Sequence, residues 1–134
     1  MTQIERIAQK YIGIPFQWGG RSMDGLDCVG LCHLFYREFD INFPADDGRE
    51  YSPEWYKTEP RRYFYELLKL GQAAPMGLFK PLDLVYFSIG GIVRHTGIMI
   101  DSYRFIHARE NQSICIEQLS SPWQRRLAGA RRLL

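Results

Sequence analysis

The stretch "GIPFQWGGRSMDGLDCVGLCHLFYREF", residues 13–39, sets a single cysteine between a glycine-rich loop and an apolar run. Asp27 is a favoured N-cap residue, and the apolar residues after it recur at helical spacing, so we predict a helix from an Asp27 cap to about Phe39. Cys28 then takes the first helical position, where unpaired N–H groups favour a thiolate and can bind an oxyanion. The plainer alternative is a small buried core residue, because free cysteine is often fully buried.

The length of 134 residues predicts one domain, residues 1–134, with a single core. The formal net charge of +2 argues against a nucleic-acid partner. The chain has three cysteines, an odd number, so at least one thiol is free, which favours a reducing compartment or a functional thiol. A run of arginines near the end predicts a solvated face, with docking to a partner or to an acidic polymer as the alternative: Arg125, Arg126, Arg131 and Arg132.

No stretch approaches the ~18 continuous apolar residues of a membrane span, and the N-terminal residues carry no apolar signal core. We therefore expect no membrane association. Synthesis in the cytosol without export by the usual route is also expected, although a larger assembly can carry the protein out.

Helical periodicity comes first along the chain and strand periodicity follows. Helices are expected over residues 2–11 and 61–70 in addition to 27–39, and strands over 82–87, 93–101, 103–108 and 113–117. Residues 40–60, rich in proline, acids and aromatics, predict an ordered surface insertion. Helices followed by short strands predict an α+β fold with an antiparallel sheet.

Two histidines fall in the strand region, His95 in "VRHTGIMID" and His107 in "RFIHARE". Antiparallel pairing about the "DSY" turn brings together positions whose numbers sum to about 204, which sets His95 and His107 nearly opposite each other on one face. A cysteine on a helix facing a base and its orienter suits thiol-based hydrolysis. Structural, hydrogen-bonded histidines are the plain alternative. A zinc site from "CVGLCH" and both histidines is disfavoured, since a Cys-x3-Cys on a helix is not a usual zinc spacing.

Four motifs in order, "GIPFQWGG…GLDCVGL", "KPLDLVYF", "RHTGIMI" and "FIHA", resemble the NlpC/P60 cysteine peptidases over nearly the whole chain. The resemblance implies a papain-like fold and hydrolysis of amide bonds in peptidoglycan stem peptides, typically beside D-glutamate, without metal or organic cofactor. The likeness is greatest to the phage-encoded branch of tail modules, which implies a virion tail location with phage tail proteins as partners.

The resemblance also assigns roles: Cys28 the nucleophile, His95 the general base, and His107 its orienter. Phe16 stands where the family has a loop tyrosine that donates to the oxyanion. Gln17 and Trp18 are therefore the candidates for a replacement N–H donor, and Asp27 is expected next to the same oxyanion and substrate-binding site. Val29 replaces a serine that in some members helps to hold the substrate's free amine.

Two other functions stay open at this stage. The first keeps the same triad for an acyltransferase or for an amidase on a non-wall substrate. The second is a tail structural or assembly component with an impaired site, which Phe16 and Val29 favour. Aromatics of the 51–65 region are expected to shape a groove or to pack on the surface: Tyr51, Trp55, Tyr56 and Tyr63.

Overall fold

The computed structural model describes residues 1–50 and 52–134, so Tyr51 lies outside the described residues. The helices are α1 (Gln3–Gln9), α2 (Cys28–Arg37), α3 (Trp55–Thr58), α4 (Arg62–Leu68) and α5 (Ser121–Arg126). The strands are β1 (Arg21–Ser22), β2 (Gly25–Leu26), β3 (Gln72–Ala73), β4 (Leu84–Ile89), β5 (Ile92–Met99), β6 (Arg104–His107), β7 (Cys115–Gln118) and β8 (Leu127–Arg132). The predicted α+β class is confirmed.

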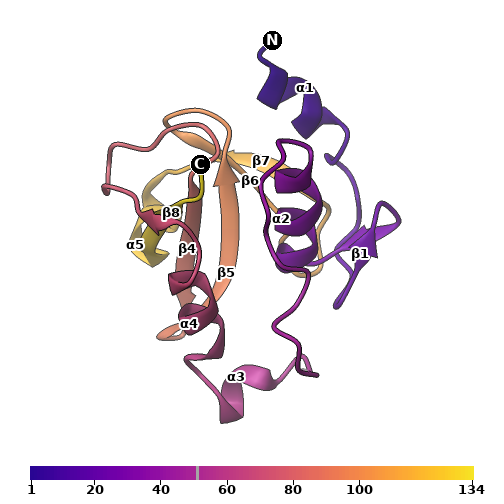
Figure 1. Ribbon diagram of the computed structural model, residues 1–134, viewed down its shortest axis with the longest axis vertical. Helices are drawn as coiled ribbons and strands as arrows, with labels where there is room; N and C mark the ends of the chain where they lie inside the picture. Colours follow the sequence, from indigo (N-terminus) through magenta and orange to yellow (C-terminus); the bar gives the residue numbers. More distant parts are fainter. Residues whose placement is uncertain (51) are drawn as a thin grey trace.

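Six strands form one antiparallel sheet in the order β3-β8-β4-β5-β6-β7, and β1 and β2 form a separate hairpin. Figure 1 shows α2 on one side of β4 and β5, with α5 on the other side. None of the helices in the described ranges is long and apolar enough to span a membrane.

The start of α2 is fixed by Asp27, as the sequence predicts. One carboxylate oxygen of Asp27 accepts from the Gly30 N–H at 2.8 Å and from Arg21 Nη1 at 2.7 Å, and the other accepts from the Gly19 N–H at 2.9 Å. This single buried side chain therefore caps the helix and also holds the glycine-rich loop against it. The N-terminal end of α1 is likewise capped, by a reciprocal capping box between Thr2 and Glu5.

Alternate residues of the central strands enter two different apolar clusters, as expected for a sheet covered on both faces. Ile98 and Ile106 pack with Leu31 and Phe35 of α2 in the first cluster. The second cluster lies beneath Trp123 of α5 and includes Phe87, Met99 and Phe105. Neighbouring positions on β5 and β6 therefore face different surroundings.

The expectation of a solvated arginine face is wrong for half of the C-terminal run. The strand β8 lies between β3 and β4, inside the sheet. Arg131 Nε donates to the Leu70 carbonyl at 2.9 Å, and Arg132 binds both carboxylate oxygens of buried Asp83 at 2.7 and 2.8 Å. These partners are distant in sequence, so a local charge pattern does not reveal them, whereas Arg125 and Arg126 are exposed as expected.

Candidate active site

Cys28 is half-buried at the first position of α2, as the sequence predicts. Its sulfur lies 4.0 Å from the hydroxyl of Tyr63 on α4, and Thr96 of β5 is close enough to lower the pKa of the thiol. The hydroxyls of Tyr63 and Thr96 are 2.9 Å apart, and Thr96 Oγ1 is 3.6 Å from Cys32 Sγ. The thiol is thus enclosed by hydroxyl groups from two other elements.

The acidity of Cys28 differs from the expectation of a preformed thiolate. Burial, followed by the negative charge of Asp27, raises the pKa of Cys28 to about 11, although the hydrogen bonds from Tyr63 and Thr96 act in the opposite direction. Desolvation of the charged form therefore outweighs the favourable helix start. In this geometry the Cys28 thiol is protonated at neutral pH.

The predicted pairing of the two histidines is confirmed. β5 and β6 pair with Gly97 opposite His107, two positions whose numbers sum to 204, and His95 Nε2 lies 2.8 Å from His107 Nδ1. Glu117 of β7 extends this chain, because its Oε2 lies 2.5 Å from His107 Nε2. Glu117 was missed in the sequence, where the only signal was its place two residues after Cys115 on the next strand.

The chain of contacts defines one arrangement of protons in the neutral pair. An ionised Glu117 only accepts, so His107 Nε2–H donates to it and His107 Nδ1 accepts from His95 Nε2–H. This leaves a lone pair on His95 Nδ1, which has no hydrogen-bond partner within residues 1–50 and 52–134. That nitrogen is suited to act as a base.

Trp123 covers both imidazoles. Its ring stacks on His95 with centroids 5.5 Å apart and meets His107 edge-on at 4.9 Å. Burial, then the neighbouring His107, lowers the pKa of His95 well below its usual value. Burial, then the Arg109 guanidinium, lowers the pKa of His107 to about 3. Both rings are therefore neutral at pH 7, as a general base and its orienter require.

The structure does not bring the predicted triad together, because the thiol lies on the α2 face of the sheet and the imidazole pair lies on the α5 face, against Phe87 and Trp123. The side chain of Thr96 points to α2, where its Oγ1 lies 3.6 Å from Cys32 Sγ, whereas the ring of His95, one residue earlier, contacts Trp123 on the other face of the sheet. Among the described residues no hydrogen bond joins Cys28 Sγ to either imidazole. β6 pairs with β5 only from Gly97 onward, so no β6 residue pairs with His95 in the sheet.

A cavity opens over Cys28, and only some of the residues that the sequence suggested for substrate binding line it. Trp18, Asp27 and Val29 line the cavity. Phe16 packs on the first apolar cluster instead. The backbone N–H of Gln17 donates to the Leu26 carbonyl at 3.2 Å, which removes this backbone group as the replacement oxyanion donor.

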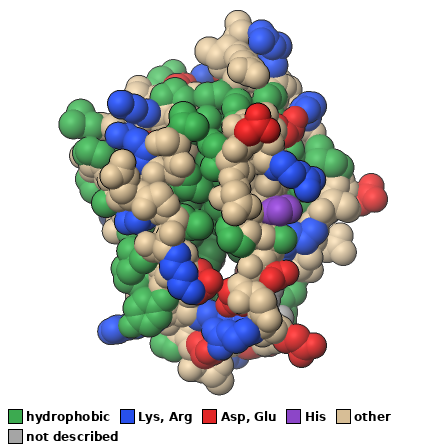
Figure 2. All heavy atoms as spheres, in the orientation of Figure 1, with side chains coloured by type: hydrophobic (Ala, Val, Ile, Leu, Met, Phe, Trp, Pro, Cys, Tyr) green, Lys and Arg blue, Asp and Glu red, His purple; other side chains and the backbone are tan. Residues whose placement is uncertain are grey.

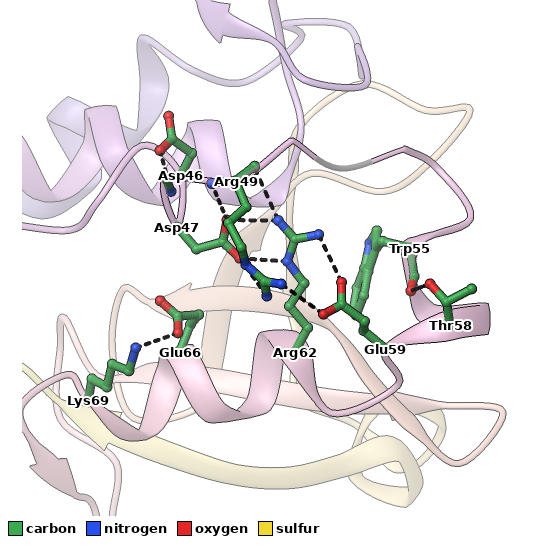
Figure 3. A network of polar contacts seen from close by, with 10 residues as sticks. Asp46, Asp47, Arg49, Trp55, Thr58, Glu59, Arg62, Glu66 and Lys69 are labelled. Carbon is green, nitrogen blue, oxygen red and sulfur yellow. Dashed lines mark hydrogen bonds and ion pairs between the residues drawn. The ribbon is translucent and has the colours of Figure 1, made fainter.

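The other walls of the cavity come from the predicted insertion and from α4. Asp47 and Arg62 form a two-bond ion pair across it, at 2.6 and 2.8 Å, with Glu59 and Arg49 beside them (Figure 3). Figure 2 shows acidic and basic side chains gathered around a hollow in the lower part of the visible face, at the level of α3 and α4 in Figure 1. The cavity thus combines an apolar floor with a charged rim.

A helix-borne thiol, packed against an antiparallel sheet that carries an imidazole pair, places the chain in the papain-like class of α+β folds. The chain belongs to the NlpC/P60 family, because the sequence model of that family matches residues 13–132.

Relatives in sequence and in structure agree with this assignment. The chain is 29% identical over 134 residues to the murein DD-endopeptidase MepS/murein LD-carboxypeptidase of Escherichia coli (strain K12). This alignment covers 96% of the present chain and 62% of the Escherichia coli protein. It is 32% identical over 130 residues to the gamma-DL-glutamyl hydrolase of Bacillus subtilis (strain 168), covering 93% and 27%. The crystal structure of an NlpC/P60 family protein from Bacillus cereus ATCC 10987 superposes with a TM-score of 0.76 at 27% identity, covering 98% and 39%. The chain spans about three fifths or less of the length of these relatives.

Proposed function

We propose that this chain is a cysteine peptidase that hydrolyses amide bonds in peptidoglycan stem peptides. The observations that carry the proposal are the Glu117–His107–His95 chain, which leaves a lone pair on His95 Nδ1, and the free thiol of Cys28 at the start of α2. Membership of the NlpC/P60 family supports the same reaction.

In the proposed reaction the Cys28 thiol gives its proton to His95 Nδ1 as its sulfur attacks the amide carbonyl. The His95 imidazolium, held through Nε2 by His107 and Glu117, then protonates the leaving amine, and an acyl-enzyme remains. His95 next takes a proton from water, whose oxygen attacks the thioester, and the proton returns to Cys28 as the acid product leaves. Because the thiol and the imidazoles lie on opposite faces of β5 in this structure, the reaction also requires the His95 ring to turn from Trp123 toward Cys28.

We assign the oxyanion hole to the Cys28 backbone N–H and the Tyr63 hydroxyl. At the first position of α2 the Cys28 N–H has no intrahelical acceptor, and it donates to no other described residue. Tyr63 Oη, 4.0 Å from the sulfur, lies where an oxygen on the attacked carbon can be reached, and its hydroxyl replaces the one lost at Phe16.

Bonds beside D-glutamate are the proposed targets within the stem peptide. The name of one relative, the gamma-DL-glutamyl hydrolase, supports this bond, whereas the names murein DD-endopeptidase and murein LD-carboxypeptidase support murein as the substrate without specifying a glutamyl bond. The charged rim of the cavity suits a peptide that carries both amino and carboxylate groups.

Digestion of purified muropeptides tests the proposal. Wild-type protein and Cys28→Ala are compared, with fragments weighed by mass spectrometry, and Cys115→Ser serves as the matched control for loss of a thiol. We expect cleavage by the wild type and by Cys115→Ser, and at least about a 10³-fold loss in Cys28→Ala. Equal cleavage by Cys28→Ala would overturn the assignment of the nucleophile.

A second candidate is a wall-binding or tail assembly component with an impaired site. The raised pKa of Cys28 and its hydrogen bonds to hydroxyls rather than to an imidazole favour this candidate. Alkylation of Cys28 by iodoacetamide, followed by mass spectrometry in the presence and absence of muropeptides, separates the two. An active enzyme gives Cys28 acylated by the muropeptide together with cleaved fragments, whereas an impaired one gives neither, even if bound muropeptide slows the alkylation. An acyltransferase would instead yield a transferred product in the same spectra.

The virion tail location and the phage tail partners remain proposals. Their support is the motif form alone, namely the replaced serine at Val29 and the segment "SPWQRRLAGARRL". Co-purification of the chain with tail proteins in virions of its source is the direct test.

A further inference from the structure

Three potential metal ligands meet at the far end of the histidine chain. His107 Nε2, Cys115 Sγ and Glu117 Oε2 all lie within 4.8 Å of one another. His107 and Cys115 face each other across β6 and β7, and Glu117 is two residues along β7, so all three side chains emerge on one face of two paired strands. The sheet thus holds the cluster on two rigid elements.

The ligand types suit zinc better than calcium or magnesium. Zinc binds thiolate, imidazole and carboxylate at about 2.0–2.3 Å, whereas the harder ions take oxygen ligands. Three protein ligands leave a fourth position open toward solvent, since Cys115 and Glu117 are half-buried while His107 is buried.

The present spacing needs one small change to accept the ion. Cys115 Sγ and Glu117 Oε2 are 3.9 Å apart, close to the separation of about 3.6 Å between two donors around tetrahedral zinc. Glu117 Oε2 and His107 Nε2 are too close at 2.5 Å. Glu117 has a flexible side chain on the edge strand of the sheet and can withdraw. Arg109, 3.7 Å from Glu117 Oε2, competes for that carboxylate and weakens binding.

We propose that His107, Cys115 and Glu117 bind Zn²⁺ and that the bound ion switches off His95 as a base. The binding stands on these three side chains alone, and its inhibitory consequence rests on the proposed peptidase function.

Inhibition follows from a change of tautomer along the chain. An imidazole that binds zinc through Nε2 carries its proton on Nδ1. As His107 Nε2 loses its proton to solvent and binds the ion, the His95 Nε2 proton crosses to His107 Nδ1, and His95 Nδ1 takes up a proton from solvent. With the Cys115 thiol proton also released, one proton leaves overall. His95 Nδ1 then has no lone pair to accept the Cys28 proton.

Metal binding is tested without reference to activity. In a Cys28→Ala background, which removes the active-site thiol, Zn²⁺ affinity is measured by competition with a chromophoric chelator, and Co²⁺ is added as a spectroscopic probe. We expect a sulfur-to-cobalt charge-transfer band that disappears in Cys28→Ala/Cys115→Ser, with zinc binding at least about 100-fold weaker. Unchanged affinity in the double variant would overturn the site.

The change of tautomer has its own readout in the same background. Nitrogen-15 NMR of the imidazoles should show the His95 proton on Nε2 without metal and on Nδ1 with one equivalent of Zn²⁺. A His95 proton that stays on Nε2 in the zinc-bound protein would overturn the inhibitory mechanism while leaving the binding site intact.

Inhibition is then measured on muropeptide cleavage by the wild type and by Cys115→Ser, which retains all the proposed catalytic groups. Zn²⁺ should inhibit the wild type at concentrations at least about tenfold below those needed for Cys115→Ser. Equal inhibition of both would place the effect at Cys28 and contradict the proposal. If neither protein cleaves, the peptidase proposal fails, and the chelator and cobalt measurements still decide the metal site.

Discussion

At the scale of single residues, the site rests on hydroxyl and imidazole groups whose proton positions are fixed by their neighbours. Thr96 illustrates this, because its Oγ1 contacts both Tyr63 Oη and Cys32 Sγ in a buried setting. Because Thr96 has two partners, it keeps the contact with Cys32 when the Tyr63 hydroxyl is removed, and the structural cost of that removal is limited.

Tyr63→Phe tests the proposed oxyanion donor. Loss of one such donor lowers kcat by about 10²–10³, whereas loss of the Tyr63–Thr96 hydrogen bond costs only about 1 kcal/mol of stability. Rates on a defined stem peptide and urea unfolding curves measure both quantities. Tyr65→Phe, an exposed tyrosine on the same helix, is the matched control and should leave kcat unchanged. A Tyr63→Phe enzyme with a raised KM and normal kcat would show that the hydroxyl serves substrate binding instead.

The buried imidazoles predict a loss of stability in weak acid. His95 and His107 have lowered pKa values in the folded protein, so below pH 6.5 the unfolded chain binds protons that the folded chain does not. Stability should therefore fall as pH drops from about 6.5 toward 3, by up to about 1.4 kcal/mol per pH unit for each imidazole.

Urea unfolding at pH 7 and pH 5.5 measures this slope above the range where carboxylates titrate. The variant His107→Asn removes one of the two titrating rings and should flatten the slope between these values. If wild type and variant lose stability equally, the buried pair does not cause the acid sensitivity.

At the scale of elements, α2 depends on the close approach of the glycine-rich loop. A methyl group on Gly30 would lie 2.1 Å from the backbone carbonyl oxygen of Gly20, which cannot move aside as a flexible side chain would. The favourable helix propensity of alanine, about 1 kcal/mol over glycine, is therefore outweighed by the clash.

Gly30→Ala should reduce the free energy of unfolding by about 1–3 kcal/mol or more, as read from urea or thermal curves. Arg37→Ala, at an exposed position near the end of the same helix, should change it by no more than about 0.5 kcal/mol. A Gly30→Ala protein as stable as the wild type would mean that the loop and the helix can separate without cost.

Sequence periodicity predicted the elements whose signals are local. The capped starts of α1 and α2, the helix α4 and the strands β4 to β7 all lie close to their predicted ranges. The β5–β6 register followed from a short turn and placed the two histidines correctly. By contrast, β8 went unpredicted, since its arginines find partners such as Asp83 only in the folded sheet.

The same distinction applies to the site. Cys28 and the histidines are marked by motifs, but the acidity of Cys28 depends on burial by α4 and β5, which no local pattern encodes. Glu117 and Tyr63 enter through strand pairing and through packing of α4. Sequence motifs thus identified the candidate catalytic residues, whereas tertiary contacts determine the protonation states of those residues.

At the scale of the whole molecule, the cavity is assembled from distant segments. Its walls come from the loop before α2, the insertion and α4, and Arg94 on β5 completes them with its guanidinium 3.7 Å from the ring centre of Tyr56. The ion pair between Asp47 and Arg62 joins the insertion to the helix that carries Tyr63. The position of the Tyr63 hydroxyl over the thiol therefore depends on a contact made outside the catalytic groups.

Asp47→Asn tests this coupling. Hydrogen bonds from Arg62 lower the pKa of Asp47 to about 2. The Arg62 side chain is only 8% exposed, so Asp47→Asn removes the negative charge that compensates a largely buried guanidinium. We expect a loss of about 3 kcal/mol in stability and a raised KM, because the cavity wall loosens. Asp46→Asn is the matched control, since exposed Asp46 bonds only the nearby Gly48 N–H among the described residues. Unfolding curves with steady-state kinetics compare the two variants. Equal behaviour of both variants would show that the insertion holds its place through apolar packing, and that Tyr63 is positioned without the ion pair.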